Sequence, residues 1–103
     1  MHGLIEQHRD EIAEICRRYA VRRLELFGSA ARATDFDPAA SDADFLVEFT
    51  PGTAMPPLKQ FFGLAEALAQ TLGRPVDLLE PSAIRNPYLR ASINQARALI
   101  YAA

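Results

Sequence analysis

Apolar side chains recur at three- and four-residue steps near the start of the chain. The stripe consists of Leu4, Ile5, His8, Ile12, Ile15, Cys16 and Tyr19. This period predicts an amphipathic helix over residues 4–19. Cys16 belongs to the stripe, so we expect a thiol in the core rather than a nucleophile.

Three short runs are rich in β-branched, aliphatic and aromatic residues, and the first two also alternate between two faces, which is typical of β-strands. The runs cover residues 21–27, 42–49 and 76–79. In the second run, alternation predicts two faces. One face would carry Asp42, Asp44, Leu46 and Glu48, and the other Phe45, Val47 and Phe49.

A second helical stripe lies between the second and third of these strands. It consists of Leu58, Phe61, Phe62, Ala65, Leu68, Ala69 and Leu72. Gly73 and Pro75 predict the end of this helix. Leu89, Ile93, Ala96 and Ile100 predict a last helix over residues 88–101 that closes the core.

The connections are expected to be a helical turn at residues 29–34, a loop at 35–40 and a turn or short helix at 81–87. The resulting order is helix, strand, turn, strand, helix, strand, helix. It predicts an α/β (α+β) fold, in which a small mixed sheet is backed by helices on one side.

The composition predicts one soluble domain. The chain has 103 residues, of which half are hydrophobic, and a net charge of −2. This charge does not indicate direct binding to nucleic acid. No apolar run reaches transmembrane length and no signal-peptide core is present, so no membrane partner is expected. The single cysteine is typical of a reducing, cytoplasmic location.

Two aspartates open the second predicted strand. One residue separates Asp42 from Asp44, so strand geometry directs both carboxylates to the same side. At about 5 Å and an effective dielectric of about 20, their repulsion costs roughly 3 kcal/mol. A bound cation would offset this cost, and hard oxygen ligands suit Mg²⁺. Residues 41–44 also match a helix capping box, S-x-x-D. The run that follows them, which ends at Thr-Pro-Gly, favours a strand.

The segment before these aspartates has the features of a phosphate-binding turn. Gly28 allows the backbone to approach closely, and Ser29 follows at an expected helix N-terminus. Ser29 also fits a structural N-cap. Arg32 would either bind phosphate or bridge to an acidic neighbour.

Asp77 is the one polar residue in the third predicted strand, V-D-L-L. An ionised and unpaired carboxylate among buried aliphatic side chains would cost several kcal/mol. Asp77 would therefore either face solvent at the strand end or act as a third ligand. The presence of Asp42 and Asp44 favours the third ligand.

Together these motifs, G-S-A-A-R at residues 28–32 and S-D-A-D-F-L-V at residues 41–47, resemble the signature of the polymerase-beta-like nucleotidyltransferases. More narrowly, they are similar to the minimal nucleotidyltransferase (MNT) proteins of prokaryotes. The family pattern is G-S-x-A-R-G, a spacer, S-D-x-D and, later, an aspartate within a strand, here Asp77. The resemblance covers nearly the whole chain, so we expect one such domain over residues 1–103. Ala33 stands where the family has glycine, and the spacer before Asp42 is slightly longer than usual.

The resemblance implies nucleotidyl transfer with ATP as substrate and two Mg²⁺ ions. It implies that the metal ligands and catalytic residues are Asp42, Asp44 and Asp77, and that the residues that seat the triphosphate are Gly28, Ser29 and Arg32. In this scheme Asp77 also helps to deprotonate the acceptor hydroxyl.

The resemblance also implies a partner. MNT proteins are commonly paired with a small helical HEPN-type RNase toxin and can transfer AMP to a tyrosine of that toxin, as antitoxins of type VII toxin–antitoxin pairs. Two other functions stay open: an antitoxin that neutralises its partner by binding alone, and an MNT module that modifies a small molecule. The sequence also leaves open whether the protein forms a homodimer.

Overall fold

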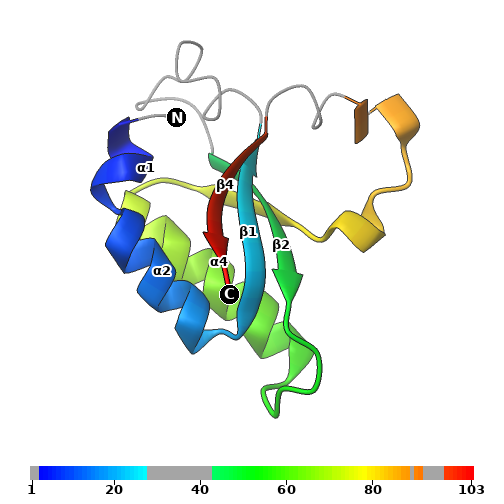
Figure 1. The fold of residues 1–103 in the computed structure, drawn as a ribbon, viewed down its shortest axis with the longest axis horizontal. Helices are drawn as coiled ribbons and strands as arrows, with labels where there is room; N and C mark the ends of the chain where they lie inside the picture. The colour runs from blue at the N-terminus through cyan, green and yellow to red at the C-terminus, as the bar shows by residue number, and fades with distance from the viewer. Residues whose placement is uncertain (1–2, 28–42, 89, 92–96) are drawn as a thin grey trace.

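The computed structural model describes residues 3–27, 43–88, 90–91 and 97–103 of the chain. Within these residues, four strands form one mixed sheet in the order β3-β2-β1-β4, and helices cover one of its faces (Figure 1). The elements in chain order are α1 (Gly3–Gln7), α2 (Arg9–Arg18), β1 (Val21–Phe27), β2 (Ala43–Phe49), α4 (Pro57–Leu72), β3 (Val76–Leu79), η1 (Pro81–Ala83) and β4 (Arg97–Ala102). The predicted fold class, a small mixed sheet backed by helices, is confirmed.

Strand direction in the sheet follows from the connections. β1 pairs antiparallel with β2 on one side and with β4 on the other. β3 pairs parallel with β2. A parallel pair needs a crossover connection, which is usually a helix, and α4 supplies it here. The three predicted strands are confirmed, although the second begins at Ala43 and Asp42 lies outside the described residues.

The main core lies between the helices and one face of the sheet. Its fully buried side chains include Ile5, Ile12, Cys16, Leu24, Leu26, Phe45, Val47, Leu64 and Leu68. On β2, Phe45, Val47 and Phe49 belong to this core, as the alternation predicts, and Asp44, Leu46 and Glu48 face the other way. A smaller apolar cluster on that opposite face consists of Phe27, Leu46, Leu79 and Ile84.

The predicted N-terminal helix is two helices in the structure. α1 ends at Gln7 and α2 begins at Arg9, because the backbone of His8 departs from helical geometry (φ −105°, ψ 14°). Ile5, Ile12, Ile15 and Cys16 of the stripe lie in the core, which confirms Cys16 as a core residue. Burial raises the pKa of the Cys16 thiol to about 12, so the thiol is protonated at neutral pH.

The long helix α4 has the predicted end but a rotated buried face. Gly73 adopts the left-handed conformation (φ +67°), and its N–H donates to the carbonyl of Ala69. Leu58 and Phe62 belong to the predicted apolar stripe, but they are 73% and 61% exposed. Gln60 is buried instead, because its side-chain amide donates to the carbonyl oxygen of Tyr19 at 2.8 Å and is thereby satisfied.

The predicted last helix over residues 88–101 is wrong at its C-terminal end, residues 97–101. The structure has helical residues at 87–88 and 90–91, and residues 97–102 form the strand β4. Here β4 pairs with β1, and its Ile100 enters the core. A register shift between Leu24 and Glu25 interrupts the alternation along this pair, so the run did not show the two-residue period of a strand. The expected turn at 29–34 and loop at 35–40 lie outside the described residues.

Gly63 on α4 permits close packing against Tyr19. A Cβ atom at Gly63 would lie 2.6 Å from Cε1 of the Tyr19 ring, well inside van der Waals contact. Inside a helix, alanine is usually more favourable than glycine by about 1 kcal/mol. We predict that Gly63→Ala does not show this gain, because the added Cβ would overlap the Tyr19 ring. In a Tyr19→Ala background, the same substitution should stabilise the protein. Urea unfolding of the four proteins of this double-mutant cycle measures the coupling. Equal effects in both backgrounds would contradict this account of the glycine.

Candidate functional site

Two of the three predicted ligands meet on neighbouring strands. Asp44 on β2 and Asp77 on β3 are direct register partners in a parallel pair. Neighbouring strands lie about 4.8 Å apart, and partners in register present their side chains to the same face. Asp44 is half-buried and Asp77 is exposed. The structure therefore brings these two aspartates together on the sheet face opposite the main core.

The register extends this pair into a row across all four strands. Asp44 is also the partner of Phe27, the last residue of β1, and Phe27 is the partner of Arg97, the first residue of β4. The row therefore runs Arg97, Phe27, Asp44, Asp77 across one end of the sheet. Gly28 follows directly after Phe27 in the chain, so the predicted phosphate-binding segment begins at this row.

The other predicted site residues cannot be placed. Gly28, Ser29, Arg32 and Asp42 lie outside the described residues. Among the residues that are described, no group of three or more histidine, cysteine, aspartate or glutamate side chains could hold a metal ion. Mg²⁺ is usually bound by one or two carboxylates together with substrate phosphates and water. Asp44 and Asp77 on one face match that donor chemistry.

A second charged group on the same face was missed by the sequence reasoning. Glu25 on β1 is 6% exposed, and arginines hold both of its carboxylate oxygens. Arg97 donates from Nη2 to Oε1 at 2.6 Å and from Nε to Oε2 at 2.9 Å, and Arg23 donates from Nε to Oε1 at 3.1 Å. The alternation of β1 could have placed Glu25 on the face of Asp44. The sequence did not predict Arg97 on this face, because residues 88–101 were predicted to form a helix.

The electrostatics of Glu25 favour its charged form. Burial by itself raises the pKa of the Glu25 carboxyl, but the hydrogen bonds and charges of Arg97 and Arg23 outweigh burial and hold this pKa below its ordinary value of 4.5. For the same reason the pKa of Arg97 is raised, chiefly by its hydrogen bond to Glu25. This arrangement is a forked ion pair between a buried carboxylate and a partly exposed guanidinium, and it fixes the arginine's orientation.

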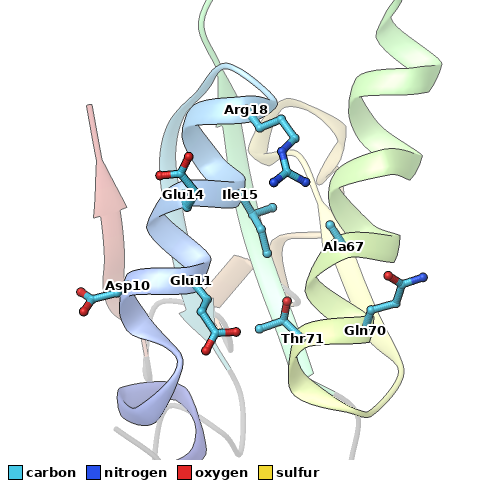
Figure 2. A pocket seen from close by; sticks show the side chains of 8 residues that line it. All are labelled: Asp10, Glu11, Glu14, Ile15, Arg18, Ala67, Gln70 and Thr71. Atoms are coloured by element: carbon cyan, nitrogen blue, oxygen red, sulfur yellow. The ribbon is translucent and has the colours of Figure 1, made fainter.

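A cavity of about 460 Å³ lies elsewhere on the molecule, between α2 and α4 (Figure 2). Ile15 and Ala67 line it together with charged and polar side chains, namely Asp10, Glu11, Glu14, Arg18, Gln70 and Thr71. Both helices pack on the core face of the sheet, whereas Asp44 and Asp77 lie on the opposite face. This cavity is therefore separate from the candidate site.

The family of the chain follows from its match to known proteins. Residues 9–100 match the family model of the nucleotidyltransferase domain. A Methanocaldococcus jannaschii protein, provisionally named a protein adenylyltransferase, is 36% identical over 92 residues, which cover 89% of this chain and 86% of that protein. The chain belongs to the nucleotidyltransferase domain family, a family of transferases.

Comparison with solved structures specifies the fold further. A chain described provisionally as a minimal nucleotidyltransferase matches with a TM-score of 0.73 and 28% identity, and the match covers 95% of both chains. A chain of a toxin–antitoxin complex with AMP-PNP matches with a TM-score of 0.66 and 21% identity over 92% of this chain and 73% of that one. A chain of the complex of a tri-AMPylated Shewanella oneidensis HEPN toxin with an MNT antitoxin matches with a TM-score of 0.63 and 18% identity, over 96% and 73%. At these lower identities the similarity is one of fold. This protein therefore has the minimal nucleotidyltransferase fold.

No helix in the described part of the chain combines the length and the apolar character that crossing a membrane requires.

The Glu25 ion pair predicts a pH-dependent stability. A carboxyl whose pKa is lower in the folded state stabilises the fold above its unfolded pKa, near 4.5, and loses this contribution as the pH falls through the folded value. Glu25→Gln should therefore lower the free energy of unfolding by about 1.5–3 kcal/mol at pH 7. The difference from wild type should shrink steadily below pH 4.5.

Chemical denaturation at pH 7 and at decreasing pH measures this difference. Glu48→Gln is the matched control, because it removes the exposed Arg22–Glu48 pair (3.1 Å) from the same sheet. This control should cost no more than about 1 kcal/mol. If Glu25→Gln lowers the free energy of unfolding as much at low pH as at pH 7, the ion-pair account is wrong.

Proposed function

We propose that this protein is a Mg²⁺-dependent adenylyltransferase that transfers AMP from ATP to a protein hydroxyl. The acceptor is a tyrosine of a HEPN-type toxin, and the protein acts as the antitoxin of that toxin. The single observation that carries the proposal is the register pairing of Asp44 with Asp77 on the open sheet face, beside the point where Gly28 begins the G-S-A-A-R segment.

The proposed site assigns a role to each predicted residue. Asp42, Asp44 and Asp77 would hold Mg²⁺. The backbone at Gly28 and the side chains of Ser29 and Arg32 would seat the triphosphate. When bound, Mg²⁺ would neutralise phosphate charge and polarise the acceptor hydroxyl.

The remaining chemistry belongs to the protein. In the transfer, a bond forms between the acceptor oxygen and the α-phosphorus, and the bond from that phosphorus to the bridging oxygen of the β-phosphate breaks. Pyrophosphate leaves with the electron pair. Asp77 is exposed and can reach a partner's hydroxyl, so its carboxylate helps to take the hydroxyl proton. Asp44 is half-buried and fixed in the central strand β2, which suits the orienting of phosphates rather than contact with the acceptor.

The proposed partner comes from the structural neighbours. One of them contains a tri-AMPylated HEPN toxin together with an MNT antitoxin, and another contains a toxin–antitoxin pair with the ATP analogue AMP-PNP. The relative from Methanocaldococcus jannaschii carries the name of a protein adenylyltransferase. These names favour a protein acceptor over a small molecule.

Substitution of the paired aspartates tests the site. Asp44→Asn and Asp77→Asn should each reduce AMP transfer by about 100-fold or more, because each removes a carboxylate from the reacting centre. For Asp77→Asn the melting temperature should stay the same or rise, because one of two neighbouring like charges is removed. Asp10→Asn on the exposed side of α2 is the matched control and should leave transfer unchanged. Full transfer by either site variant would contradict the assignment.

An acceptor assay separates the three functions. The protein is incubated with ATP labelled at the α-phosphate, Mg²⁺, a HEPN-type toxin protein and a panel of small-molecule hydroxyl acceptors. Label on the toxin, mapped to a tyrosine by mass spectrometry, is the expected result. Label on a small molecule instead would make the protein an MNT module for such substrates. Tight toxin binding without label would make it an antitoxin that acts by binding alone.

A further inference from the structure

We propose that Arg97, held in place by Glu25, is a binding residue for the triphosphate of the nucleotide. This inference rests on the proposed function and adds a cationic element to the same site. Arg97 begins β4 and occupies the row that also contains Asp44 and Asp77. With strands about 4.8 Å apart, its Cα atom lies roughly 10 Å from that of Asp44, on the other side of Phe27.

The row has opposite charges at its two ends. Asp44 and Asp77 make one end acidic. At the other end Arg97 supplies a guanidinium group, which donates to the Glu25 carboxylate, and Arg23, farther along β1, donates to the same carboxylate. A magnesium–nucleoside triphosphate complex has the complementary pattern, because its metal ions suit the carboxylates and its phosphate oxygens suit a guanidinium. The charge order of the row therefore matches the ligand.

The guanidinium of Arg97 is both oriented and accessible. Two parallel hydrogen bonds to the Glu25 carboxylate, at 2.6 and 2.9 Å, fix its plane. Its side chain is still 37% exposed, whereas that of Glu25 is 9% exposed. Arginine is the residue best suited to planar recognition of phosphate, and an arginine that is already oriented loses less conformational entropy when a ligand binds.

The burial of Glu25 itself needs an explanation. Glu25 stabilises the fold once Arg97 is present, but replacing both partners of an ion pair by apolar residues of similar volume is often neutral for stability, so stability alone does not explain why a carboxylate is buried here. The neighbouring positions on this face, Phe27 and Leu46, are apolar and buried. A carboxylate among them is explained by the orientation that it imposes on Arg97. We therefore assign Glu25 as a positioning residue.

The alternative is a purely structural role, in which the pair only joins β4 to β1. Calorimetric titration of the full chain with AMP-PNP and Mg²⁺, well below each variant's melting temperature, separates the two roles. Arg97→Gln should weaken AMP-PNP binding by about 10-fold or more. Arg97→Lys, which keeps the charge but loses the fork, should show a smaller loss. In the transfer assay, the KM for ATP should rise more than kcat falls.

Glu25→Gln tests the positioning role. It removes a negative charge near the proposed phosphates, so a simple charge effect would tighten AMP-PNP binding. Loss of the guanidinium's orientation would weaken binding, and weaker binding is the expected result. Arg22→Gln is the matched control, because it removes another strand arginine, paired with Glu48, from the far end of the sheet. Its affinity should stay within about 2-fold of wild type.

The outcomes distinguish this inference from the proposed function. Wild-type protein that does not bind AMP-PNP would overturn both. Wild-type protein that binds AMP-PNP, with Arg97→Gln binding equally well, would overturn the role of Arg97 and leave the proposed function standing. Tighter binding by Glu25→Gln would overturn the positioning role of Glu25.

Discussion

The parallel pairing of β3 with β2 is the contact on which the candidate site depends. The chain between Asp44 and Asp77 includes all of α4, and the pairing brings these residues into register. A slip of one residue would turn the Asp77 carboxylate toward the helices and the main core. Leu78 prevents the slip, because it is buried in that core and its neighbours must then face the open side. Hydrophobic burial on one face therefore positions the carboxylate on the other.

The position of β3 depends in turn on how α4 is seated. Leu64, Leu68 and Leu72 place one side of the helix on the sheet, and Gln60 connects its first turns to the Tyr19 carbonyl. At Gly63 the helix approaches the Tyr19 ring as closely as the missing Cβ allows. The left-handed Gly73 then ends the helix just before the strand begins. Contacts far from the carboxylates thus set where β3 enters the sheet.

The sequence predicted most of the elements that carry the site. Strands 21–27 and 76–79 have their predicted bounds, and Asp44 lies on the predicted face, because alternation and turn residues are local signals. The last helix was wrong because residues 88–101 contain good helix formers at helical spacing, and only pairing with β1 makes 97–102 a strand. Local sequence patterns carry no information about pairing with a strand that is distant in the chain. They also did not reveal the buried Gln60, whose partner is distant in sequence.

The Glu25–Arg97 pair was not predictable for a related reason. Its two residues are 72 positions apart, and they meet only because β4 returns to the edge of β1. Arg9 also donates to the Leu99 carbonyl at 3.3 Å, so an arginine covers a backbone acceptor of this edge strand. The open face is then neither a uniform apolar surface nor a uniformly charged one. It combines a buried apolar cluster, two neighbouring carboxylates and an arginine held by a buried glutamate. The two like-charged carboxylates repel each other, and the oriented arginine lies on the same face, so the proposed ligand, a metal–triphosphate complex, would complement both.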